Sequence, residues 1–394
     1  MTKHIYSALA TMLGIDSSCP VTATRRNQEA RQIALGLDRS GSLFFLSGLL
    51  DIFRPCRNPH SLNSTWPPNT GLPSLGIREF LIFSVLWTAT LMPTMAAIAP
   101  LEGIHRVVFL GDSITQAGDY VADVECWLLS RGHRLEVFNI GLSSETATEL
   151  TAEENAGHLK SAGFPRPFIG ERLDRSLALT KPDLLFVCYG MNDASALPEG
   201  SEGLNRYIEG ITRLRDAALR AGAKRVVLST PPVYDPKEPI SPSKRRQGAN
   251  LEAYREWLLS KRADGWEVVD IHGPMRRDLD AAKKRNPAFR LQPDGVHPNR
   301  EGHWVMAREI LSQFFDADLQ GISSSPQFFE KNGEPIRDLV KRRMKVRFDS
   351  LMTQIGHSRP KVSGGPGSPA GPSPETAEAQ SAETAKSIDS LLAP

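Results

Sequence analysis

The chain has 394 residues, enough for two or three domains of ordinary size or for one large domain with additional segments. Its 47 Lys and Arg residues nearly balance 45 Asp and Glu residues, so the formal charge of +2 excludes a strong overall attraction to nucleic acid or to an anionic membrane. A hydrophobic content of 40% and a charged content of 23% exclude a wholly disordered chain and a polytopic membrane protein. We expect a globular protein that is monomeric and binds no nucleic acid.

The four cysteines, Cys19, Cys56, Cys126 and Cys188, are widely spaced. They are too few and too scattered for a disulfide scaffold, and no pair has the C-x-x-C spacing of a zinc or redox site. Cys188 ends the apolar run Leu-Leu-Phe-Val-Cys, so we expect a small buried side chain rather than a reactive thiol.

Residues 1–103 are expected to form an N-terminal extension rather than a domain, because 15–75 show neither helical nor strand periodicity. Segment 78–99 starts with Arg78, continues with an uncharged run and ends in small residues, which is typical of a secretory signal. A signal implies a true start near 72–77 and a secreted or periplasmic protein. The alternatives are a single membrane anchor, with the following domain outside, and a buried core helix.

From residue 104 onward, short apolar runs alternate with amphipathic stretches. The expected strands are 106–110, 135–139, 184–188, 225–229 and 267–271, and the expected helices are 119–131, 169–179, 203–221, 251–262 and 301–315. This alternation predicts an α/β fold over 104–315, a three-layer α/β/α sandwich around a doubly wound, parallel five-stranded sheet. In such a sheet, ligands bind beyond the carboxyl ends of the strands.

Two segments follow this domain. Residues 316–360 are predicted to be a helical extension, with a basic helix over 334–355 whose cluster Lys341-Arg342-Arg343 we expect on a solvated face. Residues 361–394 contain no aromatic residue and many Ser, Pro, Gly, Ala and Glu residues, so we expect this tail to be disordered.

Three residues predict nucleophilic catalysis. Ser113 lies in a Gly-Asp-Ser turn after the first strand, where its hydroxyl is displayed to attack a substrate. His297 is the expected base, since imidazole both takes and returns a proton near neutral pH. Asp294, three residues earlier, is expected to hold the ring in the tautomer that faces Ser113. Acyl transfer by this triad needs no metal and no cofactor, and we expect none.

The negative charge that develops during acyl transfer needs hydrogen-bond donors that are fixed in advance. We expect these donors to be the backbone amides of Ser113 and Gly141 and the side-chain amide of Asn192. Gly141 follows the second strand and has no Cβ to obstruct the substrate oxygen. Asn192 follows the third strand, so the sheet brings both residues to the edge that carries Ser113.

Four motifs resemble those of the SGNH (GDSL-type) hydrolase superfamily, in order and spacing: GDS at 111–113, N-x-G at 139–141, G-x-N-D at 190–193 and D-x-x-H-P at 294–298. The resemblance covers 104–315 and implies a flavodoxin-like three-layer α/β/α fold. It implies the same roles for Ser113, Gly141, Asn192, Asp294 and His297. One departure is Ser144, where many members have glycine.

Within the superfamily, the stretches KPDLLFVCYGMND, VVLSTPPVYDP and DGVHPNREGH look most like the secreted branch related to carbohydrate acetylesterases. This resemblance implies a small-molecule or polysaccharide ester as substrate, with short acyl or O-acetyl groups. No apolar lid segment that would cover a long acyl chain lies between the motifs, which favours the same conclusion.

The remaining polar residues near the motifs are expected to be structural. Asp112 and Asp193 adjoin predicted catalytic residues, and their carboxylates are expected to hold backbone N–H groups of the turns. His272 is expected at the surface, and His303 falls in the last helix without a clustered third metal ligand. Tyr234, which follows the fourth strand, is the candidate for shaping the substrate pocket.

A serine esterase is the favoured function, and two alternatives from other classes stay open. One is a metal-dependent phosphoesterase that uses Asp112, Asp193, Asp294 and His297. The other is a catalytically silent carbohydrate-binding module of the same fold.

Overall fold

The sheet of the protein has five parallel strands. The structure is a computed structural model that describes residues 101–393. The strands lie in the order β2-β1-β3-β4-β5, with the bounds β1 (Arg106–Gly111), β2 (Glu136–Asn139), β3 (Leu184–Cys188), β4 (Arg225–Ser229) and β5 (Glu267–Val269). The chain thus starts in the interior of the sheet, adds one strand on one side and three on the other, which is the flavodoxin-like doubly wound order. The predicted fold is confirmed.

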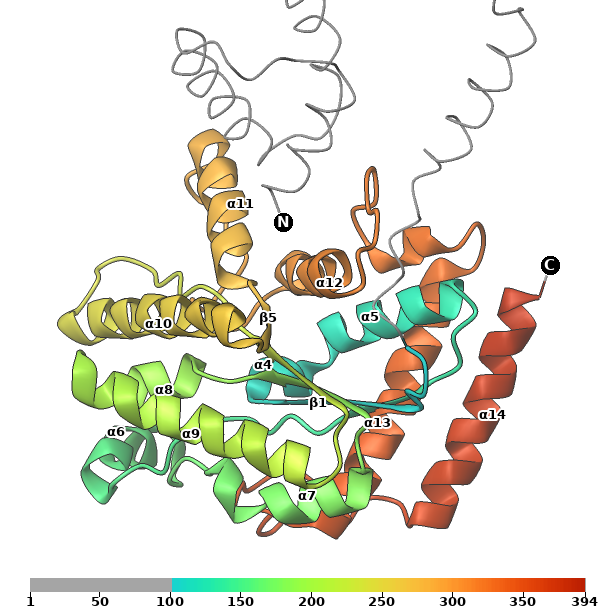
Figure 1. Cartoon of the computed structure of the whole chain (residues 1–394), viewed down its shortest axis with the longest axis horizontal. Helices are drawn as coiled ribbons and strands as arrows, with labels where there is room; N and C mark the ends of the chain where they lie inside the picture. The colour runs from blue at the N-terminus through green and yellow to red at the C-terminus, as the bar shows by residue number, and fades with distance from the viewer. Residues whose placement is uncertain (1–100, 394) are drawn as a thin grey trace, which may run out of the picture. The chain divides into compact units, whose positions relative to one another are not determined.

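Helices cover both faces of this sheet. On one face, α5 (Asp119–Ser130) packs against α12 (Arg300–Phe314), and on the other α7 (Leu173–Thr180) packs against α9 (Ser201–Arg220) (Figure 1). The remaining helices of this part are α4 (Ser113–Ala117), α6 (Ala152–Ala162), α8 (Met191–Ala196), α10 (Pro242–Ser260) and α11 (His272–Arg285), with short 3-10 turns at Ile169–Glu171, Lys261–Asp264 and Ser325–Phe328. The strands read as continuous apolar runs because both of their faces are covered.

The core lies on both faces of the sheet. All five residues of β3 are buried, and Phe109 of β1 stacks on Phe186 of β3 with ring centroids 4.8 Å apart. Cys188 is buried, as predicted, and forms no disulfide within residues 101–393. Each fully buried Leu, Ile, Val or Phe side chain of such a core contributes about 1.5–3 kcal/mol relative to an exposed one.

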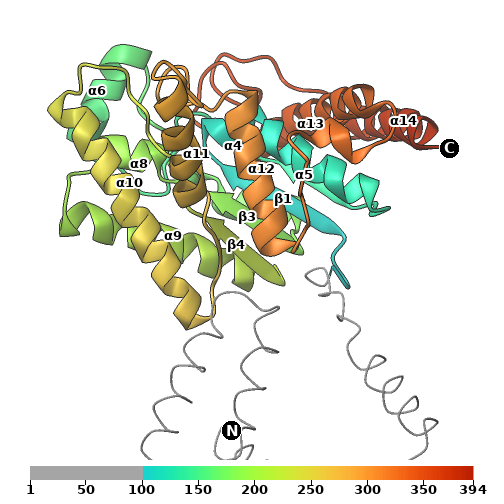
Figure 2. The same ribbon diagram turned by 90° about the horizontal axis from the view of Figure 1, so that it is seen from above.

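The C-terminal extension ends in two helices, α13 (Gly333–Ile355) and α14 (Pro374–Leu392), which lie side by side (Figure 2). The prediction of disorder over 361–394 is wrong. Ser373 caps α14 by accepting a hydrogen bond from Thr376 N, and the helix buries Ala377, Ser381 and Ile388. The tail has few apolar residues, yet it orders because α13 supplies the surface on which they pack.

Basic residues of α13 are buried in ion pairs with α5, so the predicted solvated face is wrong for Arg343. Arg343 is 8% exposed and pairs with Glu125 of α5. Arg337, 4% exposed, places Nε 2.7 Å from Asp123 Oδ1 and Nη2 2.9 Å from Asp119 Oδ1. Since α13 also contacts β2 and α7, it closes the edge of the sheet that β2 would otherwise leave open.

His272 is buried, so its predicted surface position is wrong. Its Nδ1 lies 3.1 Å from Pro231 O and its Nε2 lies 3.0 Å from Glu252 Oε1. Burial lowers the pKa of His272 and outweighs the opposing effect of the Glu252 carboxylate. The residue therefore fixes the start of α11 rather than facing water.

The signal-like segment 78–99 lies outside the described residues, so a cleaved signal or an anchor stays a prediction. Within 101–393, no helix combines the length and the apolar character that a membrane crossing requires.

Candidate active site

Ser113 is the first residue of α4, directly beyond the carboxyl end of β1. Asp112 caps this short helix, accepting a hydrogen bond from Ile114 N on its Oδ1 at 2.9 Å. A Cβ at Gly111 would lie 2.2 Å from Thr115 Oγ1 and 2.6 Å from the carbonyl oxygen of Cys188. The tight turn therefore requires glycine at 111, and it displays the Ser113 hydroxyl at the sheet edge.

His297 and Asp294 lie on the loop between α11 and α12 and meet Ser113 there. Ser113 Oγ is 2.9 Å from His297 Nε2, and His297 Nδ1 is 2.6 Å from Asp294 Oδ2. Asp294 Oδ1 accepts hydrogen bonds from the backbone N–H groups of Val296 at 2.8 Å and His297 at 2.7 Å. The structure thus brings the three predicted residues into one hydrogen-bonded chain, the geometry of a nucleophile, a base and a carboxylate that orients the base.

The carboxylate of Asp294 stays charged in this arrangement. Partial burial opposes its ionisation, but the hydrogen bonds from the His297 ring and from the two backbone N–H groups lower the pKa of Asp294 overall. A charged Asp294 accepts from Nδ1–H and leaves Nε2 of His297 to accept the Ser113 hydroxyl proton.

Asp112 and Asp193 are fully buried beside the nucleophile and act on the backbone. Burial raises the pKa of Asp112 to about 7 and that of Asp193 to about 6. Asp193 accepts hydrogen bonds from the backbone N–H groups of Ala147 at 3.3 Å and Thr148 at 3.0 Å. Asp193 therefore ties the loop that follows β2 to the start of α8, in agreement with its predicted structural role.

Gly141 does not offer the predicted oxyanion donor. Its backbone N–H donates to Asn139 Oδ1 at 2.9 Å. A Cβ at Gly141 would lie 2.5 Å from Gln116 N, so glycine is required here because the loop packs directly against α4. This occupied N–H contradicts the predicted donor role of Gly141.

Ser144, three residues further, has a backbone N–H with no hydrogen-bond partner in the described part of the chain. Its φ of 68° lies in the left-handed region that favours glycine. Its Oγ is 3.2 Å from Nε2 of His158, a residue of α6 whose Nδ1 donates to Phe164 O at 2.9 Å. These contacts hold a serine in the backbone conformation that glycine adopts freely.

Asn192 is buried at the start of α8 and its amide is held at both ends. Nδ2 donates to the carbonyl oxygen of Glu145 at 3.0 Å, and Oδ1 accepts from Nη1 of Arg166 at 2.6 Å. One N–H of the Asn192 amide remains for a substrate oxygen, as its predicted role requires. Arg166 was not singled out by sequence analysis, because it lies outside the four motifs in a loop without periodicity.

Tyr234 is half-buried on the segment that runs beside the Asp294 loop. Asp235 N donates to Gly295 O at 3.0 Å, which joins the two segments. Burial and the nearby charge of Asp294 both raise the pKa of Tyr234. Its role in shaping the substrate pocket stays a prediction.

The side chains proposed as metal donors already form hydrogen bonds with protein groups, and Asp294 is bonded to His297. Asp112 and Asp193 use their oxygens on backbone N–H groups, and His303 is buried in α12, where it stacks on Tyr120. Burial lowers the pKa of His303 to about 4. Residues 101–393 contain no cluster of three or more His, Cys, Asp or Glu side chains suited to a metal ion.

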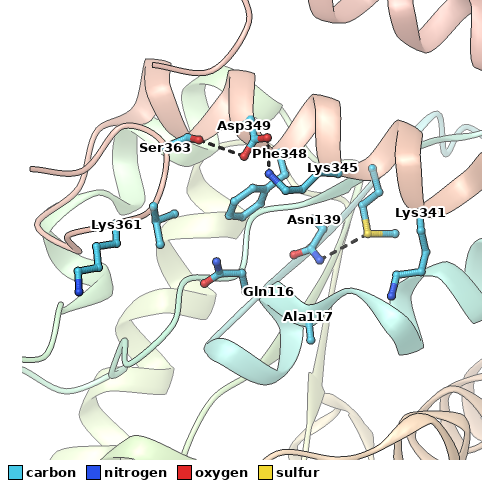
Figure 3. A pocket seen from close by; sticks show the side chains of 11 residues that line it. Gln116, Ala117, Asn139, Lys341, Lys345, Phe348, Asp349, Lys361 and Ser363 are labelled. Atoms are coloured by element: carbon cyan, nitrogen blue, oxygen red, sulfur yellow. Dashed lines mark hydrogen bonds and ion pairs between the residues drawn. The ribbon is translucent and has the colours of Figure 1, made fainter. Parts of the chain in front are cut away.

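Behind α4, a cavity of about 330 Å³ separates the catalytic loops from α13 (Figure 3). Gln116 lines this cavity, and its Oε1 accepts a hydrogen bond from Ser143 N at 2.6 Å. Two lysines of α13 line the cavity as well, but Lys341 forms an ion pair with Asp119 and Lys345 forms one with Asp349. The cavity thus lies between the C-terminal extension and Gln116, whose side chain holds the loop that contains Ser144.

The doubly wound sheet and the Ser113–His297–Asp294 chain beyond its strand ends define an α/β protein with a hydrolase-type triad. The sequence model of the GDSL-like lipase/acylhydrolase family matches residues 109–305, which is half of the chain, so the protein belongs to this family. The predicted resemblance is confirmed. No curated protein sequence matches the chain.

Similar solved structures include a gut microbial diltiazem-metabolizing enzyme, with 23% identity and a TM-score of 0.43 over 53% of this chain and 46% of that one. This chain therefore spans about half the length of that protein. An acetyl-xylooligosaccharide esterase from a Geobacillus species has 23% identity and a TM-score of 0.39 over 53% of this chain and 94% of that one. A lipase/acylhydrolase from Enterococcus faecalis has 21% identity and a TM-score of 0.36 over 52% and 95%.

Proposed function

We propose that the protein is a serine esterase that hydrolyses carboxylic esters through an acyl-enzyme on Ser113. The observation that carries the proposal is the continuous hydrogen-bonded chain from Ser113 Oγ through His297 to Asp294, with contacts of 2.9 Å and 2.6 Å. This chain lies at the sheet edge where doubly wound proteins bind their ligands.

The steps follow from the geometry. His297 Nε2 takes the proton of Ser113 as Oγ attacks the ester carbonyl, and it returns that proton to the leaving alcohol when the C–O bond breaks. Water, deprotonated by the same nitrogen, then hydrolyses the acyl-Ser113 ester. Asp294 stays ionised and stabilises the imidazolium in both halves of the reaction.

The oxyanion of each tetrahedral intermediate needs fixed donors, and three remain available around Ser113. We assign them to the backbone N–H groups of Ser113 and Ser144 and to the Asn192 side-chain amide. Ser144 replaces Gly141 in this role because its N–H is unoccupied, whereas that of Gly141 is not. Loss of one such donor typically raises the barrier by about 2.7–4 kcal/mol.

The substrate class proposed is a short-chain ester, with O-acetyl groups on carbohydrate as the leading case. The support is the sequence resemblance to carbohydrate acetylesterases and the exposure of the triad: the side chains of His297 and Asp294 are 51% and 57% exposed. An uncovered site suits an ester carried by a bulky polar alcohol.

The test uses the purified full chain with 4-nitrophenyl acetate and a fluorophosphonate probe, without added metal. Wild type is expected to turn over the ester and to be labelled covalently, and Ser113→Ala is expected to show neither. His297→Ala is expected to lose about 10³-fold or more in kcat, since the base is removed while the oxyanion donors stay. Retained turnover in His297→Ala contradicts the proposal, and an unlabelled wild type supports the silent carbohydrate-binding module instead.

A further inference from the structure

Two arginines beside the candidate active site have no carboxylate partner in the part of the chain that the structure describes. Arg166 and Arg246 are both half-buried, and neither forms an ion pair within residues 101–393. Both bind Ser195 of α8: Arg166 Nη2 donates to its Oγ at 3.1 Å, and Arg246 Nη2 donates to its carbonyl oxygen at 2.9 Å. The buried Nε of Arg246 has no hydrogen-bond partner.

The two guanidinium groups lie next to the oxyanion donor. Arg166 Nη1 donates to Asn192 Oδ1 at 2.6 Å, so its positive charge is one side chain away from the place where the ester carbonyl must bind. Arg246, which lies on α10, reaches the same residue of α8, Ser195, and lines the same cavity. A ligand that meets both arginines is therefore held close to the reacting atoms.

A cavity of about 800 Å³ opens at these arginines. Its third arginine, Arg206, is neutralised by Glu154, with Nη2 3.0 Å from Oε2. Two other carboxylates that line the cavity, Glu153 and Glu202, are exposed to water. His158 also lines it, and burial lowers its pKa, so the ring is neutral.

The nearest buried carboxyl groups do not compensate the charge of Arg166 fully. Asp193 and Asp112 act on Arg166 through space, but no hydrogen bond or ion pair joins either of them to Arg166 within residues 101–393, and burial raises the pKa of Asp112 to about 7. Desolvation disfavours the charged form of Arg166. A half-buried cation without a partner is costly, and an anionic ligand removes that cost.

We propose that Arg166 and Arg246 form an anion subsite that binds a carboxylate carried by the ester substrate. The inference rests on the proposed esterase function and names its substrate class. Two positions of the carboxylate fit the same chemistry: on the alcohol, as in an O-acetylated uronic acid, or on the acyl group, as in a half-ester of a dicarboxylic acid. Guanidinium groups suit this role because their parallel N–H groups match a carboxylate.

The experiment compares matched esters on the full chain. For the alcohol side, the pair is 4-acetoxybenzoate and its neutral methyl ester; for the acyl side, it is 4-nitrophenyl hydrogen glutarate and its methyl ester. The anionic member of one pair is expected to have a kcat/KM about 10- to 100-fold above that of its neutral partner, because charge-assisted hydrogen bonds are of that strength. The pair that shows this ratio identifies the side that carries the charge.

Arg166→Gln and Arg246→Gln are each expected to reduce that ratio toward one. Arg166→Gln is also expected to slow hydrolysis of the neutral ester, since it removes a hydrogen bond to Asn192. The ratio of the two kcat/KM values cancels this common effect and reports on the anion subsite. Arg245→Gln is the matched control, because Arg245 neighbours Arg246 but is exposed and its Nη1 donates only to Ile240 O. Its ratio is expected to stay at the wild-type value, and thermal unfolding shows that each variant is folded.

Ratios of one for both pairs in an active wild type overturn the anion subsite and leave the esterase proposal intact. If wild type turns over neither 4-nitrophenyl acetate nor any of the four esters, the esterase proposal fails. Calorimetric titration of the Ser113→Ala chain with the same esters then decides the subsite: tighter binding of an anionic member, lost in Arg246→Gln, supports it, and equal or absent binding of both members overturns it.

Discussion

Two buried aspartates beside the nucleophile make the stability of the protein depend on pH. The pKa of Asp112 rises from its ordinary value of 3.8 to about 7 because burial disfavours the charged form. The unfolded chain therefore releases this proton near pH 4, whereas the folded chain keeps it until about pH 7. Between these values the folded state binds more protons, so stability falls as pH rises. The contribution of Asp112 to the free energy of unfolding is fully present below pH 3.8 and is lost as pH rises through 7.

Asp112→Asn is expected to flatten this dependence. Asparagine keeps an oxygen that can accept the hydrogen bond from Ile114 N, but it cannot ionise. The variant therefore lacks the change in the free energy of unfolding that Asp112 causes, which is at most about 4 kcal/mol between pH 4 and 7. Urea unfolding at pH 5, 6, 7 and 8 measures the slope. Asp193, whose pKa is about 6, leaves a smaller slope of the same sign in the variant. Equal slopes in both proteins would contradict the assignment.

At the same scale, sequence motifs predicted triad side chains better than backbone donors. The chemical role predicted for each triad residue, Ser113, Asp294 and His297, follows from its type of side chain. A backbone N–H is common to nearly every residue, and whether it is free depends on local hydrogen bonds. The carboxamide of Asn139 occupies Gly141 N and leaves Ser144 N open, which no spacing rule distinguishes. The sequence did not predict Arg166 as a site residue for a related reason, since its position depends on contacts with α8.

Helix α13 is attached to α5 through buried ion pairs rather than through apolar contacts alone. The side chains of Arg343 and Glu125 are 9% and 4% exposed. Removing one partner of such a pair leaves an uncompensated charge out of water, which destabilises more than the intact pair stabilises.

Glu125→Gln is therefore expected to lower the free energy of unfolding by about 3–5 kcal/mol, because Arg343 loses its counter-charge. Glu334→Gln is the matched control, since it breaks an ion pair with Arg300 whose side chains are 57% and 54% exposed. This exposed pair is expected to contribute less than about 1 kcal/mol. Denaturant unfolding of the two variants gives both values, and equal losses would show that α13 is not held by its buried charges.

Elements with a strong apolar pattern were predictable, and the others were not. The five strands were found within a few residues of their observed bounds, because each is a run of apolar residues covered on both faces. Helix α6 was missed because none of its residues is buried, so it has no apolar stripe to detect. Its capping box, in which Thr151 and Glu154 bond each other's backbone N–H groups, was the available signal.

For residues 101–393 as a whole, the two C-terminal helices pack on the sheet domain and are part of it, rather than forming a separate extension. Composition predicted a disordered tail, because it reports what a segment can bury by itself. The surface that orders α14 belongs to α13, and the surface that orders α13 belongs to α5, β2 and α7. Such dependence on distant segments is not visible within any one window of the sequence.

Truncations are expected to show this hierarchy. A chain that ends at residue 360 loses α14 and is expected to keep the proposed esterase activity with a lower Tm, since the triad and α13 stay in place. A chain that ends at residue 315 also loses α13, which uncovers the β2 edge and leaves Asp119, Asp123 and Glu125 without their partners. Aggregation or loss of a cooperative melting transition is expected, whereas a soluble, active chain ending at 315 would contradict an integral role for α13.

The hydrogen bond between Ser113 and His297 joins residues 184 positions apart. During synthesis, the nucleophile leaves the ribosome long before its base, and all five strands emerge before the Asp294 loop does. On the proposed mechanism, a partly made chain is therefore inert toward esters even if its sheet has begun to form. If the protein is the proposed esterase, recovery of turnover during refolding is expected to follow the docking of the last quarter of the chain, which starts at the Asp294 loop, rather than the early formation of the sheet.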